Sequence, residues 1–303
     1  MKYLTLLTVV FSLVSCGSEA FKFSFSCPAN YILIPHNTSY GTTSDFCVMK
    51  YEARAWTDSD LDLEVDADGC LEGSCTTPEW GSSQKPVSTD TGLPWRMILP
   101  ETAKNRCSSL GVKYDLISNP EWMTIAVNIE AQDVNWSGST VGNGCLFRGN
   151  AGVADACTYD GSNPEGGDSS LRNTKARLTL SNGEVIWDLS GNVWEYIDWT
   201  LGGSYNVGPT TCAGTWVEFP VAACGALAAS DFMPENPSGV VAANYNSNYG
   251  LGKFKGGAIG GVYRGGSWGA ALLAGVFLMA MDADPSDLSF ADSSIGFRCV
   301  YRQ

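Results

Sequence analysis

The chain has 303 residues, of which 44% are hydrophobic and 17% charged, and its formal net charge is −14. So acidic a protein repels the phosphate backbone of nucleic acids, and we expect no nucleic-acid partner. The 34 glycines and ten tryptophans indicate many loops with aromatic anchors and little regular helix.

The N-terminus has the parts of a secretory signal peptide. A lysine at position 2 precedes an apolar run from Leu4 to Val14, and a cysteine stands at the expected cleavage point. This pattern predicts a lipoprotein in which residues 1–15 are the signal peptide, Cys16 is acylated, and residues 16–24 are a tether that holds the protein at a membrane. The alternative is an ordinary secretory signal with an incidental Cys16. Because glycine and not aspartate follows Cys16, we expect an exported bacterial protein in the outer membrane, facing the periplasm or the cell surface.

Ten cysteines remain after Cys16, and an even number of thiols in an exported chain indicates disulfide bonds. Most spacings between them are local, which predicts four short bridges and leaves one long-range pair. The expected bridges are Cys27–Cys47, Cys70–Cys75, Cys145–Cys157, Cys212–Cys224 and Cys107–Cys299. Sequence alone leaves other connectivities open. A zinc site is the competing interpretation, but the chain has no Cys-x-x-Cys pair.

The N-terminal half predicts a hairpin, an acidic insertion and two helices. Residues 31–35 and 46–53 alternate and carry β-branched or aromatic side chains, as paired strands do. Residues 58–84 form an acidic loop, which either is simply solvated or binds calcium through its spaced carboxylates. One helix is expected at 100–111, between a proline and a glycine, and another at 119–130, where Asn119 is the expected N-cap.

The C-terminal half alternates long loops with short strands. Residues 132–177 and 202–261 are rich in small and polar residues and are expected to be mostly loop. Strands are expected at 183–189, 263–268 and 295–301.

Three strings of residues occur in order in this half. They are Gly-Asn-Val-Trp-Glu at 191–195, Arg-Gly-Gly-Ser-Trp at 264–268 and Ile-Gly-Phe-Arg-Cys at 295–299. In this order they resemble the formylglycine-generating enzyme family, also called the sulfatase-modifying-factor domain. The resemblance covers residues 45–301.

The resemblance implies a single domain at 25–303, whose C-terminal motif region spans 263–301. The implied fold is α+β and C-type-lectin-like: a small twisted antiparallel sheet with two helices and extensive disulfide-pinned loops. In the family, a disulfide joins the first helix to the final strand. The resemblance therefore implies the same Cys107–Cys299 bridge that the cysteine spacing leaves over.

The first of the three strings resembles the family's calcium loop. Carried over residue by residue, the resemblance implies oxygen ligands of the kind that calcium requires. The implied ligands are Asp188, Gly191, Val193 and Glu195. The alternative is structural: Trp194 anchors a core, and Glu195 makes a buried hydrogen bond or pairs with Arg264 or Arg298.

Catalysis is where the family pattern breaks down. The family's two copper-binding cysteines would lie near Ala270 and Gly275, and neither residue can form a thiolate or bind a soft metal. We therefore expect no copper and no formylglycine synthesis. His36 is the only histidine, which excludes three-histidine iron sites, a Ser-His-Asp triad and His-Glu-x-x-His zinc hydrolases. His36 itself is expected to be an ordinary surface residue.

The segment between the last two strings, residues 269–294, resembles the variable region of proteins that retroelements diversify. Such proteins keep the frame, lack the catalytic cysteines and are often surface lipoproteins. The positions that this resemblance implies to face a ligand are Gly269, Ala270, Leu273, Leu278, Ala280, Asp282, Ala283, Asp287, Leu288, Phe290 and Asp292. Alternate residues of an extended segment face inward, so Val276, Phe277, Met279 and Met281 are expected to pack in the interior.

These features predict a lipid-anchored, non-catalytic protein that displays residues 269–294 to a protein or glycan ligand on a calcium- and disulfide-stabilised scaffold. One alternative is an enzyme of the same family with relocated chemistry, either a formylglycine-generating-type oxidase or another protein-modifying enzyme. A second alternative is a structural envelope or fibre-associated protein.

Overall fold

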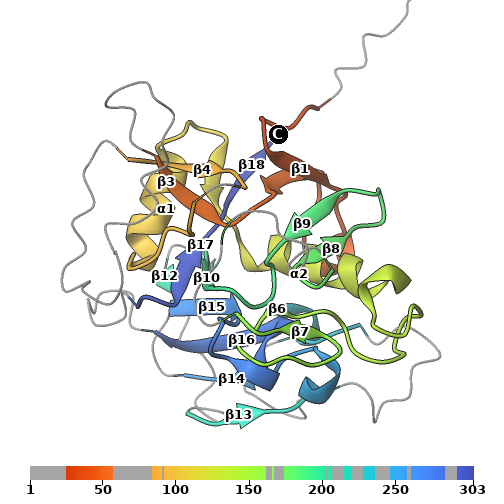
Figure 1. Ribbon diagram of the computed structural model, residues 1–303. Helices are drawn as coiled ribbons and strands as arrows, with labels where there is room; N and C mark the ends of the chain where they lie inside the picture. The colour runs from red at the N-terminus through yellow and green to blue at the C-terminus, as the bar shows by residue number, and fades with distance from the viewer. Residues whose placement is uncertain are drawn as a thin grey trace, which may run out of the picture.

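The structure, a computed structural model, describes residues 25–56, 84–90, 92–161, 166, 174–201, 204–205, 214–219, 228–235, 246–257, 261–283 and 292–303 (Figure 1). The expected signal peptide and tether with Cys16 lie outside the described residues, as do residues 58–83 of the acidic insertion. The same holds for the expected bridges Cys70–Cys75 and Cys212–Cys224. The described part is an α+β fold with two α-helices, one four-stranded sheet, one six-stranded sheet and four two-stranded sheets. None of the helices in this part is long and apolar enough to cross a membrane.

The four-stranded sheet is antiparallel and brings the two ends of the described chain together. In spatial order it contains β1 (Tyr31–Ile34), β2 (Phe46–Met49), β18 (Cys299–Arg302) and β5 (Tyr114–Leu116). The predicted hairpin of β1 and β2 is confirmed. Its second strand ends at Met49, because the chain turns there before starting β3 (Ala53–Trp56), which pairs with β4 (Lys85–Ser88).

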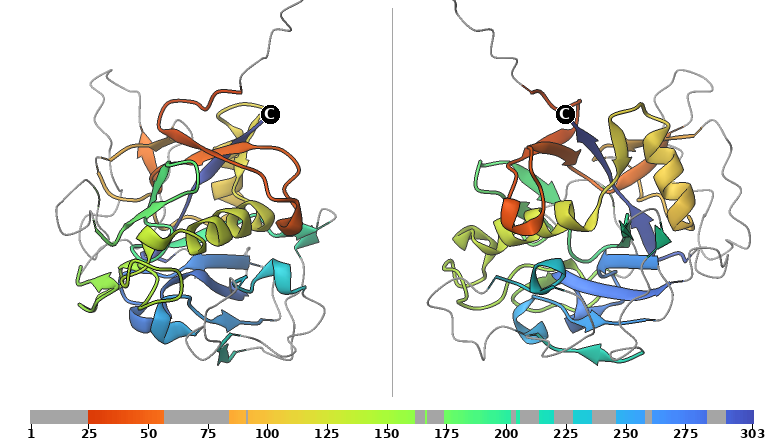
Figure 2. Two further views of the ribbon diagram at one scale, coloured as in Figure 1. Left: turned by 90° about the vertical axis from the view of Figure 1, so that its right-hand side faces the viewer. Right: turned by 180° about the vertical axis from the view of Figure 1, so that it is seen from behind.

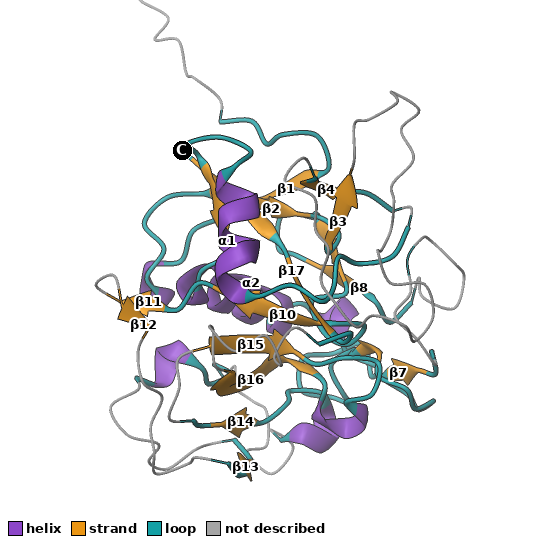
Figure 3. Cartoon of the chain, turned by 90° about the vertical axis from the view of Figure 1, so that its left-hand side faces the viewer, coloured by secondary structure: helices purple, strands orange, loops and turns teal. Residues whose placement is uncertain are grey.

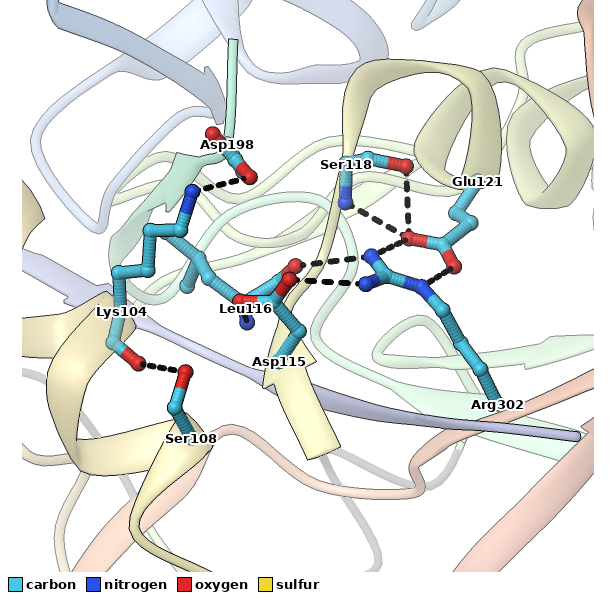
Figure 4. A network of polar contacts seen from close by, with 8 residues as sticks. All are labelled: Lys104, Ser108, Asp115, Leu116, Ser118, Glu121, Asp198 and Arg302. Atoms are coloured by element: carbon cyan, nitrogen blue, oxygen red, sulfur yellow. Dashed lines mark hydrogen bonds and ion pairs between the residues drawn. The ribbon is translucent and has the colours of Figure 1, made fainter. Parts of the chain in front are cut away.

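Arg302 fastens the last strand to its surroundings (Figure 4). Its guanidinium donates to Asp115 Oδ2 at 2.8 Å and to Glu121 Oε1 at 2.7 Å. Glu121 also accepts a hydrogen bond from the backbone N–H of Ser118 at 2.8 Å, which caps the helix that follows. Lys104 and Asp198 form a separate ion pair at 2.8 Å beside this network.

Both predicted helices are present. Helix α1 spans Pro100–Ser108 and ends before Gly111, because the N–H groups of Leu110 and Gly111 bond carbonyls three residues back and close tighter turns. Helix α2 spans Asn119–Glu130. Its N-cap is Ser118 and not Asn119, since Glu121 completes a capping box with Ser118.

The six-stranded sheet lies below α2 in Figure 1, and Figure 3 shows its strands from the side of the molecule that is on the left in Figure 1. Its spatial order is β13 (Trp216–Val217), β14 (Phe254–Lys255), β16 (Gly275–Ala283), β15 (Gly261–Gly265), β10 (Trp194–Ile197) and β17 (Ile295–Phe297). The expectation of an antiparallel sheet is wrong here, because β14 pairs with β16 and β10 with β17 in parallel. Neither parallel pair is joined by a short turn, so its direction is not fixed by a hairpin.

Short elements lie partly in the stretches expected to be mostly loop and partly elsewhere, and one short strand, Val185–Trp187, lies within the strand expected at 183–189. The two-stranded sheets are β6 (Gly149–Asn150) with β7 (Thr158–Tyr159), β8 (Arg177–Thr179) with β9 (Val185–Trp187), β11 (Thr200–Leu201) with β12 (Ser204–Tyr205), and β3 with β4. The 3-10 helices are η1 (Thr38–Tyr40), η2 (Asp133–Asn135), η4 (Ala229–Asp231), η6 (Ser247–Tyr249) and η7 (Ala271–Leu273).

Helix α2 lies between the two larger sheets, as the two further views in Figure 2 show. Its buried side chains belong to one hydrophobic core with Val48 and Val300 of the four-stranded sheet and Phe277 and Met279 of β16. Trp122 of α2 is fully buried, and its indole N–H donates to the carbonyl of Val276 at 2.8 Å. A hydrogen bond buried at this depth fixes the helix against the sheet as well as satisfying the indole.

Three predicted disulfides are confirmed among the described residues: Cys27–Cys47, Cys107–Cys299 and Cys145–Cys157. Cys107 lies in α1 and Cys299 begins β18, so this bridge joins residues that are 192 positions apart. It also anchors a second core around Trp95, Leu116 and Phe297.

Candidate functional site

Strand β16 carries half of the described part of the 269–294 segment, and its two faces differ. Met279 is paired in register with Arg264, and Arg264 donates to Asn119 of α2 at 2.6 and 3.0 Å. Because alternate residues of a strand share a face, Phe277 and Met281 lie on this α2 side with Met279. These side chains and Val276 are fully buried, which confirms that they pack in the interior.

The other face of β16 is bordered by aromatic side chains. Ala280 is paired in register with Tyr263 of β15 on one side and with Lys255 of β14 on the other. Register partners project to the same side of a sheet, so these three side chains share a face. Trp216 of β13 continues the row as the partner of Lys255.

The rings on this side form one connected cluster. Trp194 of β10 meets Tyr263 edge-on at a centroid distance of 4.9 Å and stacks with Trp216 at 6.2 Å and 16°. Lys255 Nζ lies 5.6 Å from the centroid of the Trp216 ring, within cation–π range. We call Trp194, Trp216, Lys255 and Tyr263 the aromatic face. All four side chains are half-buried, so each keeps some surface open to solvent.

Two of the expected ligand-facing positions must be corrected. Leu278 and Ala280 are fully buried, so neither side chain is open to a ligand in this structure. Leu278 packs against the backbone at Gly252 and Gly266, and Ala280 lies in register between strands that carry larger side chains. Ala280 lies between Lys255 and Tyr263 of the aromatic face.

The remaining expected positions lie before and after the buried run. Gly269 and Asp292 are exposed, and Ala270 and Leu273 are half-buried. Asp282 and Ala283 end β16, but their side chains lie outside the described part, as do residues Asp287, Leu288 and Phe290. The structure therefore brings Gly269, Ala270 and Leu273 together in one turn and does not place the full set on one surface.

The turn that contains these residues also exposes a side chain that the sequence analysis missed. Leu272 is 46% exposed at the centre of η7, whereas its neighbour Leu273 is half-buried. The turn is tied to the body of the protein by a hydrogen bond from the N–H of Ala271 to the carbonyl of Ala151 at 2.9 Å. The sequence does not indicate that Leu272 is exposed, because the residues on both sides of it are also apolar.

Gly275, near which the resemblance would place one of the two copper-binding cysteines, lies in a closed space. A Cβ atom built at this position would lie 2.4 Å from the carbonyl carbon of Leu251 and from the backbone nitrogen of Gly252. Real Cβ atoms do not approach other heavy atoms so closely. The surrounding backbone therefore excludes every side chain at position 275, and a thiol there would require the 250–252 loop to move.

The residues implied as calcium ligands lie around a buried ion pair. Arg298 donates from Nε to Glu195 Oε2 at 2.6 Å and from Nη2 to Glu195 Oε1 at 2.5 Å, and both side chains are fully buried. The same guanidinium donates to the main-chain carbonyls of Met49 and Trp187 at 3.1 and 3.0 Å. This confirms the alternative in which Glu195 pairs with an arginine.

The other implied ligands are the carboxylate of Asp188 and the main-chain carbonyls of Gly191 and Val193. Asp188 is buried on a left-handed backbone, and the carboxylate of Glu52 accepts from the N–H of Val193 at 3.2 Å. Burial, with the neighbouring carboxylates of Asp188 and Glu195, raises the pKa of Glu52 well above its usual range. Among the described residues, no three His, Cys, Asp or Glu side chains are grouped so that they could hold a metal ion. Calcium binding at Asp188, Gly191, Val193 and Glu195 stays a prediction of the resemblance.

His36 is on the surface, as expected. Its side chain is 47% exposed, and Nδ1 lies 2.7 Å from Asp45 Oδ1. The hydrogen bond from His36 lowers the pKa of Asp45.

No protein-family model matches the chain, and no curated protein matches it. Among solved structures, variable protein 1 of Treponema denticola is similar to 90% of this chain over 92% of its own length. The sequence identity is 13% and the TM-score is 0.38. At these values the likeness assigns neither a fold family nor a function to this chain.

Proposed function

We propose that the chain is a lipid-anchored, non-catalytic binding protein of a bacterial outer membrane. Its scaffold is C-type-lectin-like and related to the sulfatase-modifying-factor domain, and it presents the aromatic face and the exposed η7 turn to a protein or glycan ligand. The scaffold keeps the motifs of that family, and the 269–294 segment keeps the form of a retroelement-diversified region. Anchoring through Cys16 follows from the signal pattern.

The closed space at Gly275 is the observation that carries the non-catalytic part of the proposal. A pair of thiols at 270 and 275 is absent from the sequence, and the backbone of Leu251 and Gly252 occupies the volume that a side chain at 275 would need. The loop is fixed against β16, because the N–H of Phe277 donates to the carbonyl of Leu251 at 3.1 Å. The backbone around Gly275 therefore leaves no room for a thiol side chain, in addition to the absence of cysteine from the sequence.

The aromatic face supports the binding part of the proposal. Tryptophan and tyrosine rings offer a large contact area with few rotatable bonds, and they combine an apolar body with a polar edge. Here three rings hold one another in place by stacking and edge-on contacts, which reduces the entropy that a ligand must overcome. Lys255 adds one positive charge to an otherwise acidic protein.

The test is a binding screen of the full mature protein against immobilised glycans and envelope proteins. Trp216→Ala removes a half-buried ring, and we expect it to weaken the strongest hit about tenfold or more, as loss of an aromatic anchor does. Val134→Ser is the matched control. Val134 is 59% exposed in η2, which is not one of the strands of the six-stranded sheet. Equal binding by wild type and Trp216→Ala would remove the aromatic face from the proposal.

A copper titration combined with a thiol-peptide oxidation assay tests the enzymatic alternative. We expect neither tight stoichiometric copper binding nor turnover, because the chain offers no free thiol pair at the expected positions. Turnover with copper would contradict the proposal directly. Mass spectrometry of the N-terminal peptide tests the anchor, with acylated Cys16 as the expected species.

A further inference from the structure

A hollow of about 310 Å³ lies between the turn after β2 and the β8–β9 hairpin, outside the six-stranded sheet. Lys50 and Tyr51 line it from the turn, and Arg177, Glu184, Val185 and Trp187 line it from the hairpin. Its volume is at the lower end of the range for small-molecule sites. None of these residues takes part in the function proposed above.

The floor of the hollow is held rigidly. Tyr51 and Trp187 stack with a centroid distance of 5.9 Å and an angle of 27°, and Trp187 is only 4% exposed. The N–H of Trp187 donates to the carbonyl of Lys50 at 2.9 Å, and the N–H of Tyr51 donates to Ser88 Oγ at 3.1 Å. Arg177 is the register partner of Trp187 within the hairpin. The bond to Lys50 and the ring stacking fix the turn to the hairpin, and the bond to Ser88 fixes the turn to β4.

Two cations stand over this floor. The guanidinium of Arg177 lies 5.8 Å from the Trp187 centroid, and Lys50 Nζ lies 5.7 Å from the Tyr51 centroid. Within the described part of the chain, no ion pair joins either cation to a carboxylate. A second hollow of similar volume differs on this point, because its arginine, Arg302, is already bound to Asp115 and Glu121. The hollow at β8–β9 therefore keeps positive charge available for an anion.

Glu184 sets a second requirement on the ligand. It lines the same hollow and is exposed, so a ligand that is only an anion would meet repulsion from its carboxylate. A ligand with hydroxyl groups would instead donate hydrogen bonds to Glu184 while its acidic group pairs with Lys50 and Arg177. We propose that this hollow binds the carboxylate of a sugar acid, with the sugar hydroxyls directed to Glu184 and the ring carbons against Tyr51 and Val185.

The test is titration calorimetry of the full mature protein with D-glucuronate, and with D-glucose, acetate and sulfate as comparison probes. We expect glucuronate to bind about tenfold or more tightly than glucose, which lacks the acid, and than acetate and sulfate, which lack the hydroxyls of a sugar. Lys50→Met and Arg177→Gln should each weaken glucuronate about tenfold, as loss of a charged hydrogen bond does. Glu184→Gln should reduce the preference for glucuronate over acetate.

Lys113→Met is the matched control, because Lys113 Nζ also lies 5.7 Å from a tyrosine centroid, that of Tyr301, but does not line the hollow. It should bind glucuronate like wild type, and thermal unfolding should show that all four variants are folded. The proposal fails if wild type does not bind glucuronate, if acetate or sulfate binds as tightly, or if Lys113→Met weakens binding as much as Lys50→Met. Trp216→Ala should leave glucuronate binding unchanged, so this test and that of the aromatic face succeed or fail separately.

Discussion

The two faces of β16 are equally buried but are built for different purposes. On the α2 side, Phe277 and Met279 join a continuous core in which Trp122 is also fully buried. On the other side, Leu278 and Ala280 are as deeply buried, but the rings beside them are half-open to solvent. A buried residue of β16 can therefore belong either to the continuous core or to a face whose neighbouring side chains are open to solvent. The exposure of its register neighbours shows whether a face ends in core or in a surface that can bind.

The largest effect is expected on the α2 side. Phe277→Ala removes a fully buried ring, and we expect the free energy of unfolding to fall by about 3–5 kcal/mol, because the surrounding core cannot close the cavity completely. Urea denaturation followed by tryptophan fluorescence measures it. A loss similar to that of a surface substitution would mean that this face is not the continuous core described above.

A smaller loss is expected where β16 begins. Gly275→Cys would push a side chain against the backbone of Leu251 and Gly252, and relief of this overlap should cost about 1–3 kcal/mol of stability. The variant tests the closed space independently of ligand. If Gly275→Cys is as stable as wild type, the 250–252 loop can move at little cost, and the structure would not exclude a thiol at this position.

On the aromatic face, stability and binding should separate. Trp216→Ala leaves the core intact and removes one stacking contact with Trp194, so we expect a stability loss of about 1 kcal/mol. The same substitution should weaken ligand binding about tenfold or more, as stated for the screen. Both quantities should be measured on one preparation. Phe277→Ala should lower the stability more than Trp216→Ala does and weaken ligand binding less. If Trp216→Ala lost as much stability as Phe277→Ala, the aromatic face would be part of the hydrophobic core and not a separate surface.

The smallest effect is expected for calcium. Glu195 is the register partner of Arg264 and so belongs to the α2 side of the sheet, where Arg298 already binds both of its carboxylate oxygens. We therefore expect an unchanged Tm when calcium is replaced by a chelator. A Tm that rises with calcium concentration would instead support the ligand set implied by the family resemblance.

Local signals in the sequence carried much of the fold. Proline at the first turn and a polar cap placed both helices, and short cysteine spacings placed two of the disulfides that the structure contains. The run at 276–281 is apolar at every position, which is typical of a strand buried on both sides. The ligand-facing positions that the resemblance implied are therefore wrong at Leu278 and Ala280.

Long-range partners could not be predicted in the same way. Trp194 and Trp216 stack although β15, β16 and β14 lie between their strands, and no local pattern around Trp216 indicates a strand there. Arg264 is the register partner of Glu195, but its guanidinium donates to Asn119, and Arg298 pairs with Glu195 instead. Such facts belong to the tertiary packing and have no signature within a few residues of either partner.

The place of β18 in the four-stranded sheet has a consequence for the order of assembly. The β1–β2 hairpin is among the first described parts of the chain to be made, yet the edge of β2 is covered only by β18, from which Cys299 N–H reaches Met49 Sδ across 250 residues. Until that strand arrives, the hairpin presents an unpaired edge to other chains. Pairing over such a separation is slow, because the entropy of closing so large a loop is lost before the contacts form. The four-stranded sheet is therefore completed only after the C-terminal strand has been made.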